Sequence, residues 1–257
     1  MTAPSARQVT VCASAKGGQG CTTIAAVLAV LAAHNNQPTL LLDTRGDAAP
    51  TLGVSDPAPA GTFAEAMANA VEPCRHLRVA TIAGDQIDSD ATSELERLIA
   101  AGHRVIVDTG TDHDVLHRFD PLSPQRLLVT RPCYVALRRA IGVPFVPDHV
   151  VVISEHQRCL KERDVSLALA LPVTSLPYDA AIARAIDAGL RAARLPRCLA
   201  NRSLNSSLSN QPSRTRVDVH GFEAAGDVTA LRTGAVGRPT GGRVSSLGGQ
   251  LRRCGTH

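Results

Sequence analysis

The sequence predicts an α/β fold in three layers, with a mostly parallel, twisted sheet and helices on both of its faces. Unbroken apolar runs that end in an acid occur at Thr39–Asp43 and at His103–Asp108. Such runs are typical of strands buried on both faces of a parallel sheet. In addition, the β-prone segment Gln8–Cys12 leads through a glycine-rich turn into Thr23–Ala33, an apolar segment of helix length. Strand, turn and helix in this order are typical of doubly wound sheets.

Later segments continue the alternation of strands and helices. A helix is expected from Thr62, a capping residue with Glu65 three positions later, and another at Ala91–Ala101, which Gly102 stops. The Pro- and Ala-rich stretch Ala48–Gly61 is expected to be a loop. The remaining expected strands are Leu77–Ile82, Arg126–Thr130, His149–Ser154 and a strand within Pro172–Asp179, and the remaining helices are Cys133–Ala140 and Ala180–Ala193.

Composition divides the chain into a domain and a tail. The chain has 257 residues and 44% hydrophobic residues, which is enough for one large domain, here residues 1–200. From Asn201 onward there are eight arginines against three acids, and Ser, Gly and Asn dominate. Residues 201–257 are therefore expected to be a disordered tail. Because this tail carries a charge of about +5 and the whole chain +4, the folded part is near neutral, at about −1, and shows no strong nucleic-acid signal.

Cysteine usage and hydropathy indicate a reduced, cytoplasmic protein. The seven cysteines are scattered and show no spacing typical of a metal site. The first residues lack the apolar segment of a signal peptide, and the longest apolar run, Ile24–Ala33, is too short to span a bilayer. An aromatic content of 2% excludes a stacking surface for single-stranded nucleic acid. We expect no transmembrane segment.

The glycine-rich turn is the first candidate site. Glycines let successive backbone N–H groups point inward, and the start of the following helix adds partial positive charge, so the turn can cradle a phosphate. Lys16 is one of only two lysines among 27 Lys and Arg residues. A lysine in a chain that otherwise uses arginine indicates a position that needs a compact ammonium group on a flexible side chain. A chance surface lysine remains the alternative. The predicted nucleotide-binding residues are Lys16, Gly17, Gly18, Gln19, Gly20, Cys21, Thr22 and Thr23.

This turn departs from the usual phosphate-binding pattern G-x-x-x-x-G-K-[ST] at Ala15 and at Cys21. It resembles the deviant Walker A loop of the ParA/MinD family of P-loop ATPases, x-K-G-G-x-x-K-[ST], with Lys16, Gly17–Gly18 and Thr22 at matching positions. Cys21 stands where that family has its phosphate lysine. The layout of the loop is thus retained while one of its charges is lost.

Two acidic stretches extend the resemblance. Asp108 ends a strand of β-branched residues and is followed by Thr109, as in the family's Walker B stretch, which implies that Asp108 and the Thr22 hydroxyl hold Mg²⁺. The family's D-x-D motif, whose second acid positions the attacking water, is similar to Asp43-Thr44-Arg45-Gly46-Asp47. Arg45 occupies the place of the second acid. Asp43 and Asp47 are therefore catalytic candidates, and a solvated turn with two incidental acids remains the alternative.

The resemblance covers roughly residues 8–195. Thr130-Arg131-Pro132 is similar to the family's Thr-x-Pro stretch, and Pro177 and Tyr178 lie in a turn similar to the one that flanks the nucleotide base. The resemblance implies ATP and Mg²⁺ as cofactors and a nucleotide-dependent homodimer in which Lys16 reaches the partner's phosphates. Partner proteins of pilus assembly, secretion or partitioning are implied in the same way.

The function predicted is that of a ParA/MinD-like ATP-binding positioning or partitioning switch with slow or absent hydrolysis, similar to the TadZ/CpaE-type proteins that place pilus machinery at a cell pole. Loss of the phosphate lysine costs about one to two decades of affinity. One alternative is an active ParA/MinD-type ATPase in DNA or plasmid partitioning. Another is a redox-sensing module in which Cys21, at a helix N-terminus, ionises.

Overall fold

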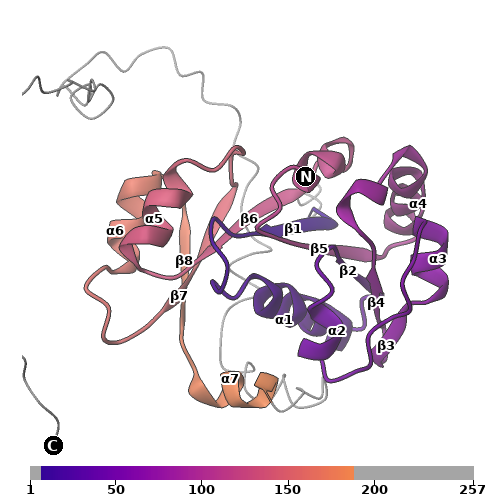
Figure 1. Cartoon of the computed structure of the whole chain (residues 1–257), viewed down its shortest axis with the longest axis horizontal. Helices are drawn as coiled ribbons and strands as arrows, with labels where there is room; N and C mark the ends of the chain where they lie inside the picture. Colours follow the sequence, from indigo (N-terminus) through magenta and orange to yellow (C-terminus); the bar gives the residue numbers. More distant parts are fainter. Residues whose placement is uncertain (1–6, 188–257) are drawn as a thin grey trace, which may run out of the picture. The chain divides into compact units, whose positions relative to one another are not determined.

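A single eight-stranded sheet organises the protein, whose structure is a computed structural model that describes residues 7–187. The strand order is β3-β4-β2-β5-β1-β6-β7-β8, and every neighbouring pair is parallel except β3 and β4 (Figure 1). The strands are β1 (Val9–Ala13), β2 (Thr39–Asp43), β3 (Val71–Cys74), β4 (Leu77–Thr81), β5 (Arg104–Gly110), β6 (Gln125–Thr130), β7 (His149–Ser154) and β8 (Val173–Pro177). The predicted mostly parallel sheet is confirmed.

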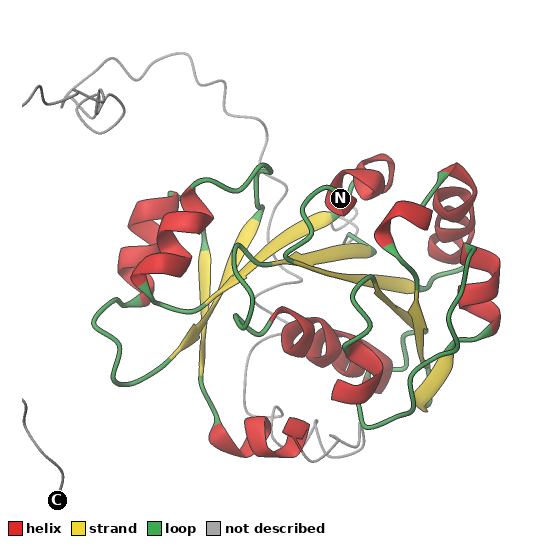
Figure 2. Ribbon diagram, viewed as in Figure 1, coloured by secondary structure: helices red, strands yellow, loops and turns green. Residues whose placement is uncertain are grey.

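Helices cover both faces of this sheet and complete the predicted three layers (Figure 2). The face covered by α1, α2 and α7 lies below the sheet in Figure 1, and the opposite face packs against α3, α4, η2, α5 and α6. The helices are α1 (Cys21–His34), α2 (Ala48–Thr51), α3 (Phe63–Ala68), α4 (Ser89–Ala100), α5 (Tyr134–Ile141), α6 (Glu162–Leu169) and α7 (Ala180–Asp187), with the 3-10 helices η1 (Gly84–Gln86) and η2 (Val115–Leu122).

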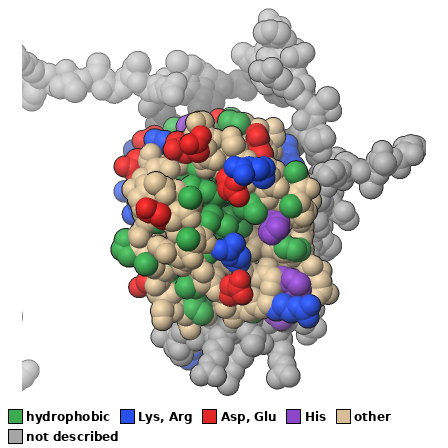
Figure 3. Space-filling view, turned by 90° about the vertical axis from the view of Figure 1, so that its right-hand side faces the viewer, with side chains coloured by type: hydrophobic (Ala, Val, Ile, Leu, Met, Phe, Trp, Pro, Cys, Tyr) green, Lys and Arg blue, Asp and Glu red, His purple; other side chains and the backbone are tan. Residues whose placement is uncertain are grey.

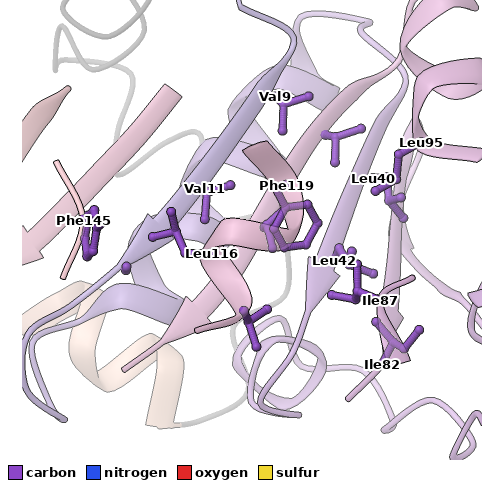
Figure 4. Packing of buried hydrophobic residues seen from close by; sticks show 14 of the residues in the cluster. Val9, Val11, Leu40, Leu42, Ile82, Ile87, Leu95, Leu116, Phe119 and Phe145 are labelled. Carbon is purple, nitrogen blue, oxygen red and sulfur yellow. The ribbon is translucent and has the colours of Figure 1, made fainter. Parts of the chain in front are cut away.

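Aliphatic side chains fill the core on both sides of the sheet. Every residue of β1 and β2 is buried, as the unbroken apolar runs predicted. On one face α1 packs almost all of its length against the sheet with small and aliphatic side chains. On the other, the fully buried Phe119 of η2 lies among Val9, Leu40 and Leu116 (Figure 4). This packing fixes the strand ends that carry the candidate site.

Most of the predicted elements are confirmed, with boundary shifts of one to three residues. The predicted loop Ala48–Gly61 is wrong at its start, where α2 forms. Four further elements were not foreseen: the edge strand β3, which contains Pro73, and the helices η1, η2 and α6. The predicted helix Ala180–Ala193 is seen as α7 up to Asp187, and its remainder and the predicted tail 201–257 lie outside the described residues.

Within residues 7–187, no helix is long and apolar enough to cross a membrane. On the face that lies to the right in Figure 1, toward α3 and α4, acidic and basic side chains are interspersed around a hydrophobic centre (Figure 3). Charges of mixed sign do not form the basic stripe that marks a nucleic-acid interface. This face therefore agrees with the near-neutral charge predicted for the domain.

His149, at the start of β7, should make the fold sensitive to acid. Its side chain is 2% exposed, its Nε2 lies 2.8 Å from Thr174 Oγ1, and burial lowers its pKa. The unfolded chain, with an ordinary histidine pKa of about 6.5, then binds a proton more readily than the native state, so stability falls as pH drops below about 6.5. We expect His149→Gln to flatten this slope in urea unfolding curves, whereas the exposed control His156→Gln should retain it. Equal slopes in all three proteins would contradict this account.

Candidate functional site

The carboxyl ends of the parallel strands meet at one edge of the sheet, where ligands bind in open α/β sheets. The glycine turn follows β1 there, and β5 lies beside β1. Ser14 opens the turn and is held by the carbonyl of Gly110, which accepts hydrogen bonds from Ser14 N at 2.7 Å and from Ser14 Oγ at 3.2 Å. Thr109 Oγ1 donates to Cys12 O at 3.1 Å. The end of β5 therefore fixes the start of the turn.

The turn itself is an open cradle. Gly18 and Gly20 have φ values of +74° and +89°, which other residues rarely adopt. A Cβ added at Gly17 or Gly18 would meet nothing within 4 Å, whereas at Gly20 it would lie 2.6 Å from Ile153 Cδ1. Within residues 7–187, Lys16 Nζ donates one hydrogen bond, to the neighbouring Gly17 O at 3.3 Å. The positions of Gly17 and Gly18 are thus free of close contacts from other described residues.

Cys21, the first residue of α1, stands where the resemblance leads one to expect a lysine. Cys21 is 6% exposed, and Thr22 and Thr23 are half-buried. Burial, and then the nearby Asp108 carboxylate, raise the pKa of the Cys21 thiol far above its ordinary value. The prediction that Cys21 ionises as a redox sensor is wrong, because the desolvation of a buried thiolate outweighs the positive end of the helix.

Asp108 lies beneath the cradle with spare bonding capacity. Its side chain is fully buried, and its Oδ1 accepts a hydrogen bond from Gly110 N at 3.0 Å. Its Oδ2 is buried and accepts no hydrogen bond from a nitrogen or oxygen donor among the described residues, while the Cys21 thiol lies close enough to the carboxylate to interact with it. An orphaned buried carboxylate oxygen is costly unless a cation or a water of its shell meets it. Asp108 and the Thr22 hydroxyl therefore fit a Mg²⁺ site in their chemistry.

The two catalytic candidates on the β2 loop differ sharply. Asp43 is fully buried, and its carboxylate accepts three backbone N–H groups, from Arg45 at 2.8 Å, Gly46 at 2.9 Å and Ala48 at 2.7 Å. The bond to Ala48 fixes the start of α2, which explains why this stretch is not a simple loop. Burial nevertheless raises the pKa of Asp43. Asp47 is exposed and its side chain makes no cap to α2.

A chain of contacts that sequence reasoning missed connects the cradle with the far strands. Gln19 is buried, and its Oε1 accepts a hydrogen bond from Arg131 N at 2.9 Å, just after β6. The Arg131 guanidinium pairs with Glu155 at 3.1 Å and lies 5.8 Å from the centre of the Tyr178 ring. Tyr178 and Pro177, at the end of β8, thus belong to the same edge of the sheet as the cradle, three strands away from β1. Nothing in the local sequence marks Gln19 and Arg131 as partners.

A pocket of about 360 Å³ lies between the ends of β7 and β8 and the start of α6. It is lined by Pro132, Ser154, Glu155, His156, Leu160, Lys161, Glu162, Arg163 and Ser175. Neither Pro177 nor Tyr178, the residues predicted to flank a base, contributes to it. This pocket was not predicted, because α6 was not foreseen.

Similar arrangements of these elements occur in known protein structures. The chain is similar to a ParA-family ATPase from Chlorobium tepidum, with a TM-score of 0.60 and 18% identity over 79% of this chain and 96% of that one. It is also similar to the septum site-determining protein MinD of Pyrococcus horikoshii in complex with Mg-ADP, with a TM-score of 0.57 and 15% identity over 78% and 93% of the two chains. For the MinC:MinD cell division complex of Aquifex aeolicus the TM-score is 0.57 and the identity 16%, over 76% and 97%.

No protein-family model and no curated protein sequence matches the chain. Because the identities with the solved structures are so low, the likeness shows the fold alone. That fold is the P-loop α/β fold of the ParA/MinD-type ATPases. The resemblance read from the glycine turn is thereby confirmed at the level of architecture.

The geometry of Asp43 leads to a stability prediction. Asp43→Ala should lower the free energy of unfolding by about 1–3 kcal/mol, because it leaves buried backbone donors, that of Ala48 above all, without an acceptor. Asp47→Ala, the matched control on the same loop, should change it by less than about 0.5 kcal/mol because its side chain is exposed. Urea unfolding measures both, and equal effects of the two changes would contradict the structural role of Asp43.

Proposed function

We propose that the protein binds a nucleoside triphosphate, ATP, together with Mg²⁺ at the cradle after β1. The observation that carries the proposal is an open glycine cradle at the start of α1 next to a buried carboxylate, Asp108, with an unpaired oxygen. Backbone N–H groups and the helix start favour phosphate, and the carboxylate oxygen favours a cation. Both halves of a magnesium-nucleotide complex thus have complementary groups.

The residues take distinct roles in this proposal. The backbone from Lys16 to Gly20 surrounds the phosphates, and the Lys16 ammonium adds a charge at the rim. The hydroxyl of Thr22 and the carboxylate of Asp108 hold Mg²⁺, which neutralises phosphate charge when bound. Pro177 and Tyr178 lie on the base side of the edge, beyond Arg131. Thr23 supports the loop from the first turn of α1, and Gln19 connects the loop to Arg131, the residue after β6.

Hydrolysis is proposed to be slow or absent. Cys21 places a neutral thiol where the resemblance expects the phosphate lysine, and Arg45 replaces the acid that would position water. Of the two other acids, Asp43 has both carboxylate oxygens bound to backbone N–H groups, and Asp47 is exposed on the loop. No carboxylate is thus free and preorganised to orient a water at the cradle among these loop residues.

At the level of biology, the proposal is a nucleotide-dependent homodimeric switch in the cytoplasm that positions a partner of pilus assembly, secretion or partitioning, in the manner of TadZ/CpaE-like proteins. The fold supports this reading through its similarity to ParA- and MinD-type proteins, one of which is in complex with MinC. The second candidate function is an active partitioning ATPase. It is favoured by the similarity to a MinD in complex with Mg-ADP, and turnover measurements separate the two.

The proposal is tested by calorimetric titration with ATP in the presence and absence of Mg²⁺, combined with a phosphate-release assay. We expect binding that Mg²⁺ strengthens and phosphate release far below about 1 s⁻¹, the lower end of typical enzymes. In Asp108→Asn the Mg²⁺ enhancement should disappear, because the amide removes the charge that faces the cation. Absence of ATP binding in the wild type would refute the proposal, and rapid turnover would favour the active ATPase.

Restoring the missing lysine gives a second test. Cys21→Lys should tighten ATP binding by about ten- to hundredfold, the value of one hydrogen bond to a charged group. Cys21→Ser, which matches the thiol in size and adds no charge, should leave the affinity unchanged. Thermal unfolding controls for the burial of position 21. If a folded Cys21→Lys protein binds ATP no better than the wild type, the phosphates do not lie at the start of α1.

A further inference from the structure

A second cation lies beside the start of the cradle, on the loop after β2. The side chain of Arg45 runs across Gly110, where an added Cβ would lie 3.1 Å from Arg45 Cγ and 3.8 Å from Arg45 Nε. Gly110 is also the residue whose carbonyl holds Ser14 N and Oγ at the start of the glycine turn. Arg45 and the start of the cradle therefore contact the same residue, Gly110, although 29 positions separate Arg45 from Lys16 in the sequence.

The backbone of Arg45 is held by hydrogen bonds, whereas its guanidinium forms no ion pair within residues 7–187. Its backbone N donates to Asp43 Oδ1 at 2.8 Å, and the preceding Thr44 binds Asp108 O through its backbone N at 3.1 Å and through its Oγ1 at 2.9 Å. The residue itself is exposed. Within residues 7–187, no acidic side chain forms an ion pair with its guanidinium. A cation that is anchored through its backbone and forms no ion pair within residues 7–187 is suited to bind an anion at the adjacent cradle.

The cradle needs such a charge because Cys21 cannot supply it. A cysteine side chain carries no positive charge, so the first turn of α1 contributes only its partial helix charge. The unpaired Oδ2 of Asp108 adds negative character close to the same place. A guanidinium, unlike an ammonium, presents two parallel N–H groups that match two oxygens of one phosphate.

We propose that Arg45 is a phosphate-binding residue that supplies the positive charge missing at Cys21. The inference rests on the proposed function, and it deepens that function by naming a side chain that binds the phosphates of the ligand. The ligand class is a polyphosphate, whether carried by a nucleoside triphosphate or present as inorganic tripolyphosphate. Compared with the pattern that the chain resembles, Cys21 removes a positive charge at the start of α1, and Arg45 replaces an acid with a positive charge beside the cradle. In this arrangement the second change compensates for the first.

The experiment compares the dissociation constants of ATP and of inorganic tripolyphosphate for the full chain by calorimetry. Arg45→Ala should weaken the binding of both ligands by about ten- to hundredfold, since it removes a charge-assisted contact. Arg45→Lys should recover most of the loss for ATP. Arg75→Ala is the matched control, because Arg75 is also an exposed loop arginine but precedes β4, at the opposite edge of the sheet. It should bind both ligands as the wild type does.

The outcomes separate this inference from the proposed function. If the wild type binds ATP and Arg45→Ala binds it equally well, Arg45 does not contact the phosphates, while the proposed function stands. If Arg45→Ala and Arg75→Ala lose affinity alike, the effect is one of net charge and the inference fails. If the wild type binds neither ATP nor tripolyphosphate, the proposed function fails and this inference fails with it.

A double-mutant cycle tests the claim that Arg45 replaces the charge absent at position 21. With a lysine introduced by Cys21→Lys, the loss caused by Arg45→Ala should shrink to less than about threefold, because the cradle then has another cation. If the two changes act independently on the ATP affinity, the two positions do not compensate for each other. The single Arg45→Ala measurement decides the phosphate contact itself, even where Cys21→Lys lowers the stability of the fold.

Discussion

The buried carboxylate of Asp108 is the constraint around which the candidate site is built. One of its oxygens is paired with Gly110 N, while the other is buried and accepts no hydrogen bond from a nitrogen or oxygen donor in the described part of the chain. Leaving such an oxygen unmet costs on the order of 1–3 kcal/mol, more for a charged group. The hydrophobic packing of β5 between β1 and β2 offsets this free-energy cost, since three of the strand's aliphatic side chains are fully buried. A cation bound at this oxygen would return that free energy, so that ligand binding and fold stability are coupled.

The charges around the cradle are arranged in an unusual way for a phosphate site. The helix start carries a neutral thiol, whereas two unpaired cations, Lys16 and Arg45, lie at the rim on different loops. Rim cations reach an incoming anion through solvent and are held less rigidly than a lysine in the first helical turn. Such an arrangement favours capture of a polyphosphate over the exact charge placement that a phosphoryl-transfer transition state requires.

The sequence predicted the architecture well because its signals are local. The unbroken apolar runs of β2 and β5 and the glycines at positive φ identify strands and turn without any knowledge of their neighbours. What it missed depends on how side chains pack and bond in the folded chain. The carboxylate of Asp43 binds the backbone N of Ala48 at the start of α2, a role that the similarity of this stretch to the D-x-D motif did not reveal. Cys21 was read as reactive from its helix position, and only the packing that buries it removes that reactivity.

The two ends of the candidate site also differ in how far they are preformed. At the cradle the glycines leave open space, and the backbone is already curled. At the base end, Arg131 lies over the Tyr178 ring at 5.8 Å, within the range of direct cation–π contact, and pairs with Glu155. A base that stacked on the face of Tyr178 nearest to Arg131 would have to displace this guanidinium and break its ion pair, whereas phosphates meet no such cost. Since Arg131 N also holds Gln19 of the turn, any displacement of Arg131 is transmitted to the cradle itself. In the proposed mode of ATP binding, the phosphates therefore meet a backbone that is already curled, whereas a base that displaces Arg131 also perturbs the cradle.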